Sequence, residues 1–156
     1  MMLTISSVTI SFIIVSVLYI AKLATKFKLD LKRAINEEAS AFNRVDKHSL
    51  NKHLDNIFDK INSIGLPTQR VKIGNAKALE YLTGYFYGIT SLYIDEKSID
   101  NEDMSYVLLC RIFDSYIEKP WADFSKSRII MIPYSKESRA FIHGTNSAYQ
   151  DFMKIN

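Results

Sequence analysis

The sequence predicts a mainly α-helical protein, with one N-terminal transmembrane helix followed by a small helical domain. Three observations favour this fold class. Residues 1–21 carry no charged side chain, and a dense basic cluster follows directly at residues 22–33. Through the rest of the chain, apolar residues recur every three or four positions, the spacing of an amphipathic helix. One short two-stranded β element, pairing residues 71–73 with residues 128–134, is the predicted addition to this helical fold.

The segment 1–21 has the length and composition of a membrane span. A helix rises 1.5 Å per residue, so about 20 apolar residues cross the roughly 30 Å of hydrocarbon in a bilayer. Six hydroxyl residues dilute its apolar character, but in a helix their hydroxyls can donate to preceding carbonyls. Tyr19 stands directly before the lysines, where an interfacial aromatic residue belongs.

A cleaved signal peptide and a buried core helix are the two alternatives for this segment. A signal peptide carries basic residues before its apolar run, and here none precedes it. The small-residue motif at residues 21–24 would also place Lys22 three residues before the cut. A core helix needs a domain large enough to bury it, and this segment is apolar on all its faces. We therefore expect a span.

The charges that flank the span predict its orientation. Residues 22–33 contain five basic residues and one acidic residue, a charge of +4, whereas the whole chain carries +3. Flanking basic residues remain on the cytoplasmic side, so the N-terminus should lie outside and residues 34–156 should form a cytoplasmic domain of a cell-membrane protein. Attraction to anionic membrane lipid is a second role for this cluster. The candidate membrane-interface residues are Tyr19, Lys22, Lys26, Lys28, Lys32 and Arg33.

The domain itself shows a series of helix signals. The helix that leaves the span should continue to about residue 44, and Asp46 or Ser49 should cap the next helix, which ends at Gly65. A later helix should begin at an N-cap on Asp100 and end before Pro120. Residues 121–127 are expected to form a loop with Trp121 and Phe124 tucked against the core, and a final helix is expected to begin at a cap on Ser135.

The predicted helix at residues 79–93 has an unusual pair of faces. One face carries large apolar residues, and the other carries Gly84 and Gly88. Each glycine costs a helix about 1 kcal/mol, so another segment should approach closely there. A central core helix is the favoured interpretation. The alternative is a partner-binding surface, because tyrosine is enriched in recognition surfaces; its residues would be Tyr81, Gly84, Tyr85, Phe86, Tyr87 and Gly88.

No motif in the sequence indicates a cofactor, a metal site or an enzyme. His48 and His53 are five residues apart, whereas two ligands on one helix face need a spacing of four. Cys110, paired with His143 as a base, is the nucleophile pair that the sequence offers, but a cysteine within an apolar helix is more often structural. As the single cysteine it has no disulfide partner within the chain, which fits a reducing compartment. The basic residues are local, so no nucleic-acid partner is expected.

These observations predict a membrane-anchored binding or adaptor protein that holds a protein partner at the cytoplasmic membrane face. The alternative is a subunit of a membrane assembly, or a toxin-neutralising protein of the immunity type, that acts through its transmembrane helix. Ser7 and Ser11 have the small-xxx-small spacing that lets two spans approach closely. The oligomeric state is left open by the sequence.

Overall fold

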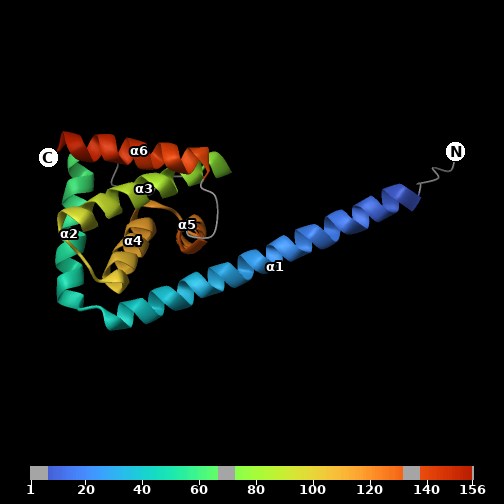
Figure 1. The fold of residues 1–156 in the computed structure, drawn as a ribbon, viewed down its shortest axis with the longest axis horizontal. Helices are drawn as coiled ribbons and strands as arrows, with labels where there is room; N and C mark the ends of the chain where they lie inside the picture. The colour runs from blue at the N-terminus through green and yellow to red at the C-terminus, as the bar shows by residue number, and fades with distance from the viewer. Residues whose placement is uncertain (1–6, 67–72, 132–137, 156) are drawn as a thin grey trace.

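The computed structural model describes residues 7–66, 73–131 and 138–155, with side chains from Phe12 onward (Figure 1). Over this part of the chain it contains six helices and no strand, which confirms the mainly α fold class. The helices are α1 (Ser7–Arg44), α2 (Lys47–Ser63), α3 (Ala76–Glu96), α4 (Glu102–Tyr116), α5 (Trp121–Met131) and α6 (Arg139–Lys154).

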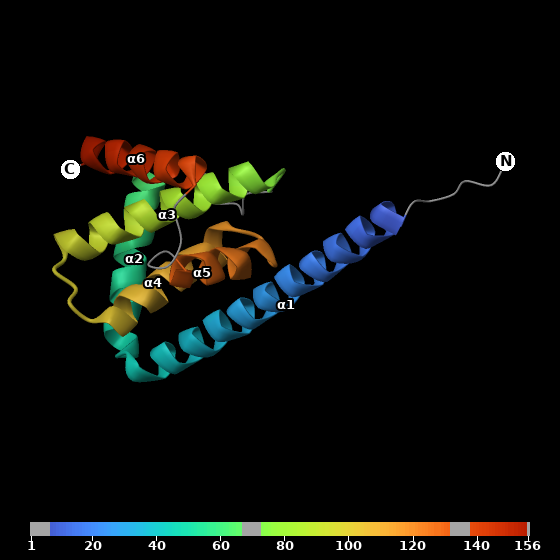
Figure 2. The same cartoon turned by 45° about the vertical axis from the view of Figure 1, so that its right-hand side comes forward.

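The first helix, α1, dominates the outline of the molecule. It is continuous over 38 residues, or about 57 Å at 1.5 Å per residue. Its C-terminal part lies beside α4 and α5, whereas its N-terminal part extends past the domain alone, as both Figure 1 and Figure 2 show. Ala34 is the first fully buried side chain among those described. The predicted basic segment and the start of the predicted domain therefore belong to one helix.

Residues close by in the sequence determine where α2 begins and where it ends. The side chain of Asp46 accepts a hydrogen bond of 2.7 Å from the backbone N–H of Ser49, so Asp46 is the N-cap of α2. Gly65 follows α2 with a φ of +81°, the left-handed conformation that glycine adopts at a helix end. Both features were predicted from the sequence, Asp46 as one of two candidates.

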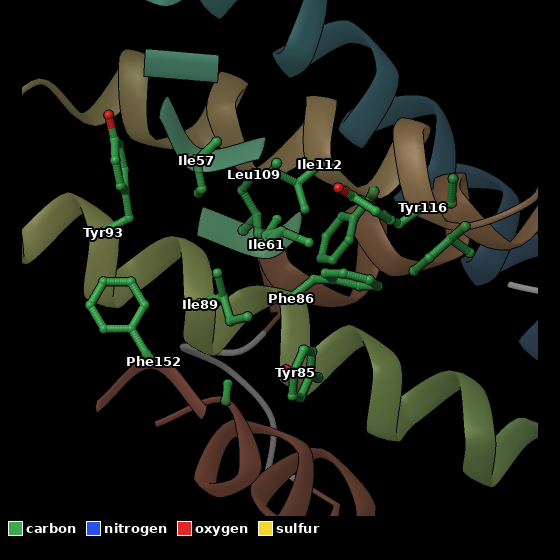
Figure 3. Packing of buried hydrophobic residues seen from close by; sticks show 14 of the residues in the cluster. Ile57, Ile61, Tyr85, Phe86, Ile89, Tyr93, Leu109, Ile112, Tyr116 and Phe152 are labelled. Carbon is green, nitrogen blue, oxygen red and sulfur yellow. The ribbon is translucent and has the colours of Figure 1, made fainter. Parts of the chain in front are cut away.

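The main core lies where α2, α3, α4 and α6 meet (Figure 3). Ile57 and Ile61 from α2 point into it, and Phe86 of α3 stacks on Tyr116 of α4 with ring centroids 5.1 Å apart. A second cluster joins α1 to α2 and α4. Its members are Ala41, Val45, Leu50, Met104, Val107 and Leu108. The second cluster fixes the C-terminal end of α1 against the domain.

The most extensive helix pair is α3 with α6. A Cβ atom on Gly84 would lie 2.1 Å from the carbonyl oxygen of Phe141, and one on Gly88 would lie 2.9 Å from the Cβ of Ala148. Since the contacts advance along both helices in the same direction, the pair is parallel. Gly144 contributes from the other side, where a Cβ would lie 2.0 Å from the carbonyl oxygen of Tyr81. The close approach predicted for the glycine face of 79–93 is therefore confirmed, and α6 makes it.

The prediction of a two-stranded β element is wrong for those of its residues that the structure describes. Arg128–Met131 continue α5, Ile73 lies outside any strand, and residues 71–72 and 132–134 fall outside the described residues. The expected loop at 121–127 is helical as well. Pro120 stands at the start of α5, because its carbonyl accepts from the N–H of Phe124 in the first turn of that helix, whereas α4 already ends at Tyr116. A short apolar run has the same composition in a buried helix and in a strand, so its pattern favoured the wrong one.

Two predicted caps were displaced along the chain. Asn101, not Asp100, caps α4 by accepting from the N–H of Met104. Ser138, not Ser135, caps α6 by accepting from the N–H of Phe141. Ser135 itself lies outside the described residues. In each case a second polar residue close by in the sequence makes the bond.

The predicted span is only partly covered by the structure. Residues 1–6 lie outside the described residues, as do the side chains of residues 7–11, which include Ser7 and Ser11. Within what is described, none of the helices combines the length and the apolar character needed to cross a membrane.

Candidate functional site

The projecting part of α1 exposes apolar side chains on all of its faces. From Phe12 to Leu29 eleven large apolar residues are between 42% and 74% exposed, and only Phe27 among them has a ring contact with another helix, α5. They are Phe12, Ile13, Ile14, Val15, Val17, Leu18, Tyr19, Ile20, Leu23, Phe27 and Leu29. The domain does not bury residues 12–20, so the described part of the predicted span is not a core helix of this fold. A continuous apolar surface of this kind marks a site of interaction.

The five basic residues form an arc on the side of α1 that is turned away from the domain. At about 100° per residue, Lys22, Lys26 and Arg33 fall within about 40° of one another, and Lys32 and Lys28 extend the arc to about 160°. All five are exposed, and Arg33 binds Glu37 one turn along at 2.7 Å. The structure thus brings the predicted interface residues together on one surface, with Tyr19 one turn before Lys22 and 62% exposed.

On its opposite side α1 meets the domain soon after the predicted span. The ring of Phe27 packs against Phe124 of α5, with centroids 5.6 Å apart. About two turns further on, the hydroxyl of Tyr106 in α4 donates to the carbonyl of Ala34 at 3.3 Å. Arg44, the last residue of α1, makes two bonds of 2.6 Å to the carboxylate of Asp103, which lowers the pKa of that carboxyl. The domain is held along α1 from Phe27 to Arg44.

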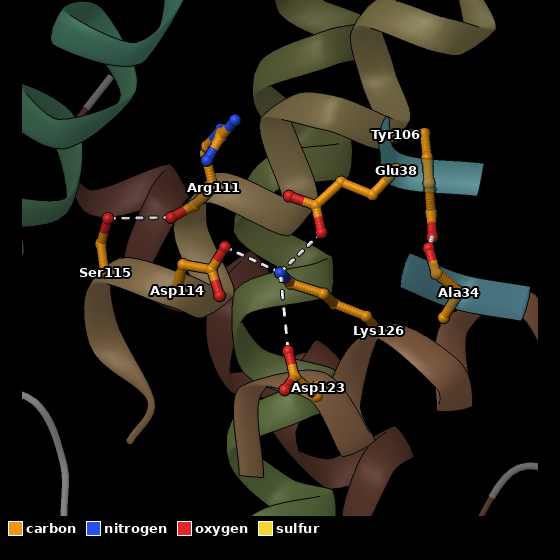
Figure 4. Close-up of polar contacts among 8 residues, drawn as sticks. All are labelled: Ala34, Glu38, Tyr106, Arg111, Asp114, Ser115, Asp123 and Lys126. Carbon is orange, nitrogen blue, oxygen red and sulfur yellow. Dashed lines mark hydrogen bonds and ion pairs between the residues drawn. The ribbon is translucent and has the colours of Figure 1, made fainter. Parts of the chain in front are cut away.

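A buried lysine ties α1 to α4 and α5 (Figure 4). The side chain of Lys126 is 3% exposed, and its Nζ lies 2.7 Å from Oε2 of Glu38 and 2.7 Å from Oδ2 of Asp114. Asp123, one turn earlier in α5, is 3.9 Å away. Burial lowers the pKa of Lys126, but the hydrogen bonds and charges of Asp114 and Glu38 outweigh it, so the pKa lies above its usual value. Lys126 therefore stays protonated, and its ammonium group lies between the carboxylates of this cluster.

The residues predicted as a partner-binding surface are distributed over the α3–α6 contact. Gly84, Tyr85, Phe86 and Gly88 are buried, and α6 or the core covers them. The hydroxyl of Tyr85 donates to Asp151 of α6 at 3.0 Å, and burial followed by this bond raises its pKa. The remaining two, Tyr81 and Tyr87, are partly buried and contact the rings of His143 and Phe141 on α6. In this fold α6 occupies that face.

The two residues of the predicted nucleophile pair have different surroundings. Cys110 in α4 is 1% exposed, and burial followed by the charge of Glu38 raises the pKa of its thiol to about 12. His143, by contrast, lies on the exposed side of α6 against Tyr81. His53 faces the hydroxyl of Tyr93 at 2.9 Å. Among the described residues no group of three or more His, Cys, Asp and Glu side chains is arranged to hold a metal ion.

No protein-family model, curated protein or solved structure matches this chain. The function is therefore argued from the chemistry of its own surfaces.

The Lys126 cluster was missed by sequence reasoning. The segment 121–127 was interpreted as a loop, so the spacing of Asp123 and Lys126 carried no weight. On a helix these two residues lie on one face at i and i+3. The other two members, Glu38 and Asp114, come from α1 and α4. Only the tertiary fold brings them together.

Proposed function

We propose that this chain is a single-pass membrane protein whose helical domain binds a protein partner at the cytoplasmic face. The observation that carries the proposal is the exposed apolar stretch of α1, residues 12–29, followed by a basic arc. Apolar surface left in water costs about 25 cal/mol per Å², and eleven large side chains are involved here. A bilayer relieves this cost on every face of the helix at once, whereas one partner helix covers a single face.

The anchor in this proposal is residues 1–21, part of which lies outside the described residues. Its twenty-one uncharged residues match the thickness of the hydrocarbon. Tyr19 would lie at the headgroups, and Lys22, Lys26 and Lys28 would remain on the cytoplasmic side. Because Phe27 packs against α5, the domain would follow the bilayer surface directly, with no flexible linker.

A binding role is favoured over catalysis by the state of the single cysteine. The Cys110 thiol is buried and stays protonated at neutral pH, since its pKa is about 12. Nucleophilic attack needs the thiolate and access to a substrate, and this environment disfavours both. The domain instead offers a rigid helical body fixed to the anchor.

Alkaline extraction of membranes from cells that express the full chain tests the anchor. The wild-type chain should remain with the membrane pellet. A Phe12→Lys, Ile13→Lys double variant should move to the supernatant, because each lysine near the centre of the span costs about 3 kcal/mol. Tyr149→Lys, an equally exposed position on α6, is the matched control and should remain in the pellet. Release of the wild-type chain by alkali would overturn the proposal.

The alternative function, a membrane-assembly or immunity-type subunit acting through its span, makes a different prediction for one experiment. Replacing residues 1–21 with an unrelated span should leave an adaptor able to retain its partner, as measured by co-purification in detergent. The same replacement should abolish the activity of a subunit whose span pairs with another helix, because side-chain packing between spans is specific.

A further inference from the structure

One end of the domain faces the direction in which α1 extends. In both Figure 1 and Figure 2, the N-terminal ends of α3 and α6 lie at that end, and Figure 2 shows the connection between α4 and α5 on the same side. Phe27 stands six residues beyond Ala21, about 9 Å along the helix axis, and its ring meets Phe124 of α5. The headgroup layer is itself several ångströms thick. With the proposed span in place, this end of the domain therefore lies at the level of the headgroups.

This end carries an exposed tryptophan beside basic residues. Trp121, the first residue of α5 and the only tryptophan in the chain, is 41% exposed. From its sequence context Trp121 was expected to be tucked against the core, but the structure leaves it exposed. Lys119 precedes it, and Lys77 and Arg139 stand at the first turns of α3 and α6; all three are exposed. Tryptophan favours the headgroup region because its ring is apolar and its N–H is polar.

Of the three acidic residues that the structure describes at this end, two are engaged within the fold. Glu80 accepts from Arg128 at 3.3 Å and from the hydroxyl of Ser138 at 3.0 Å. Asp123 belongs to the Lys126 cluster. Glu118, half-buried in the α4–α5 connection, is the acidic neighbour of Lys119. Lys77, Lys119 and Arg139 thus give the exposed part of this end a positive charge.

The same end is hollowed between its helices. An open hollow of about 760 Å³ lies between the first turns of α3 and α6, lined by Tyr81, Leu82 and His143 with Lys77 and Arg139 beside them. A smaller one of about 230 Å³ has Trp121, Phe124 and Leu79 in its walls. Apolar walls beside cationic side chains suit an amphiphile that carries a negative headgroup.

We infer that this end of the domain is a second membrane contact, in which Trp121 enters the interface and Lys77, Lys119 and Arg139 bind anionic phospholipid headgroups. The inference rests on the proposed span, which sets the level and the side of the bilayer. It assigns the domain an orientation, pressed against the membrane with its opposite end free. That opposite end, where α3 and α6 finish, would be the part presented to the cytoplasm.

Fluorescence of the single tryptophan tests this directly on the full chain. The chain is reconstituted in phosphatidylcholine vesicles, with or without phosphatidylglycerol, and with lipids brominated near the headgroup. We expect brominated lipid to remove about half of the Trp121 emission, as for a ring in the interfacial layer. The quenching should be stronger with phosphatidylglycerol. A Lys77→Glu, Lys119→Glu, Arg139→Glu variant should lose that lipid dependence, whereas Lys154→Glu at the opposite end should keep it.

The outcomes separate this inference from the proposed function. If the chain stays in the vesicles through an alkaline wash but Trp121 is not quenched, the second contact is wrong and the span stands. If the chain is washed off, both fall. If Trp121 is quenched equally in both lipids and in the charge-reversed variant, headgroup binding by the three basic residues is overturned. Binding of a soluble protein to this end, without quenching of Trp121 by brominated lipid, would assign the surface to that protein instead.

Discussion

Two glycines show how closely single residues control this fold. Gly84 of α3 and Gly144 of α6 each stand where the backbone of the other helix passes, and a methyl group there would collide with a carbonyl oxygen at about 2 Å. A carbonyl of a helix backbone cannot move aside as a flexible side chain can. Parallel contact between α3 and α6 therefore depends on the absence of a side chain at both positions.

Gly84→Ala and Gly144→Ala should each lower the free energy of unfolding by about 2–3 kcal/mol, the cost of overpacking a well-filled interior. This loss should appear although alanine is the better helix former by about 1 kcal/mol. Urea unfolding of the full chain in detergent measures the change. Gly74→Ala is the control, because a Cβ there meets nothing within 4 Å. Equal stability of Gly84→Ala and the wild type would contradict the close contact.

Lys126 is the other residue whose substitution should strongly lower the free energy of unfolding. Removing one partner of a buried ionic cluster leaves the other charges without compensation, at a cost of about 3–5 kcal/mol. Lys126→Met should show that loss, whereas Lys154→Met, whose side chain is 73% exposed in its pair with Asp151, should change stability by less than about 0.5 kcal/mol.

The pH dependence of the Lys126 contribution follows from the direction of its pKa shift. A lysine whose pKa is raised on folding stabilises the fold fully below its ordinary pKa and loses that effect as the pH rises through the raised value. The difference between wild type and Lys126→Met should therefore stay constant between about pH 6 and pH 9. A difference that grows or shrinks over this range would contradict the assignment.

At the scale of helices, the attachment of α1 to the domain can be followed through Cys110. The charges of Glu38 in α1 and Lys126 in α5 both act on this thiol, which α4 carries and the fold buries. A helix that lifts away from the domain would remove Glu38 from the Lys126 cluster. The thiol therefore serves as a natural reporter of the position of α1.

In the folded chain, Cys110 should react with a thiol reagent at pH 8 about two orders of magnitude more slowly than a free cysteine, because burial suppresses the thiolate. Glu38→Ala should increase the labelling rate about tenfold by loosening α1. Glu37→Ala, the neighbouring residue that binds only the exposed Arg33 in the described contacts, should leave the rate unchanged. Equal rates in both variants would mean that Glu38 does not hold α1 in place.

The helices that the sequence predicted well are those with a long apolar stripe and a local cap. Asp46 and Gly65 bound α2 by contacts within a few residues, so the local sequence was sufficient. The prediction for segment 121–131 failed because its apolar residues form no stripe at helical spacing and its stability comes from contacts with other helices. Phe124 needs Phe27 of α1, and Lys126 needs Glu38. No local pattern encodes contacts between residues about a hundred positions apart.

The candidate site, like the helices, could be predicted from the sequence only where it depends on residues close together in the chain. The basic arc of α1 lies in one stretch of sequence, and helical spacing alone gathers it on one side. The glycine face of α3 was recognised as a place of close approach, but its partner was not, since α6 lies some sixty residues later. The position of Trp121 depends on where α5 begins, so its exposure at one end of the domain followed only from the fold.

The whole molecule combines a rigid domain with a long helix, α1. The N-terminal part of α1 extends beyond the domain, which does not cover it. Six helices form the described part of the chain, and one of them reaches about 57 Å. Because α1 continues without a break from the exposed apolar stretch into the core, a membrane anchor at its N-terminal end would hold the domain in one orientation. We expect that orientation to determine which surfaces of the domain a cytoplasmic partner can reach.

Protease treatment of sealed membrane vesicles of known sidedness tests the central claim most directly, on the full chain with a C-terminal epitope. The proposed topology predicts that the epitope is resistant in intact spheroplasts and is lost in inside-out vesicles, because residues 34–156 lie on the cytoplasmic side. Loss of the epitope from intact spheroplasts, or recovery of the chain in the soluble fraction, would contradict the account.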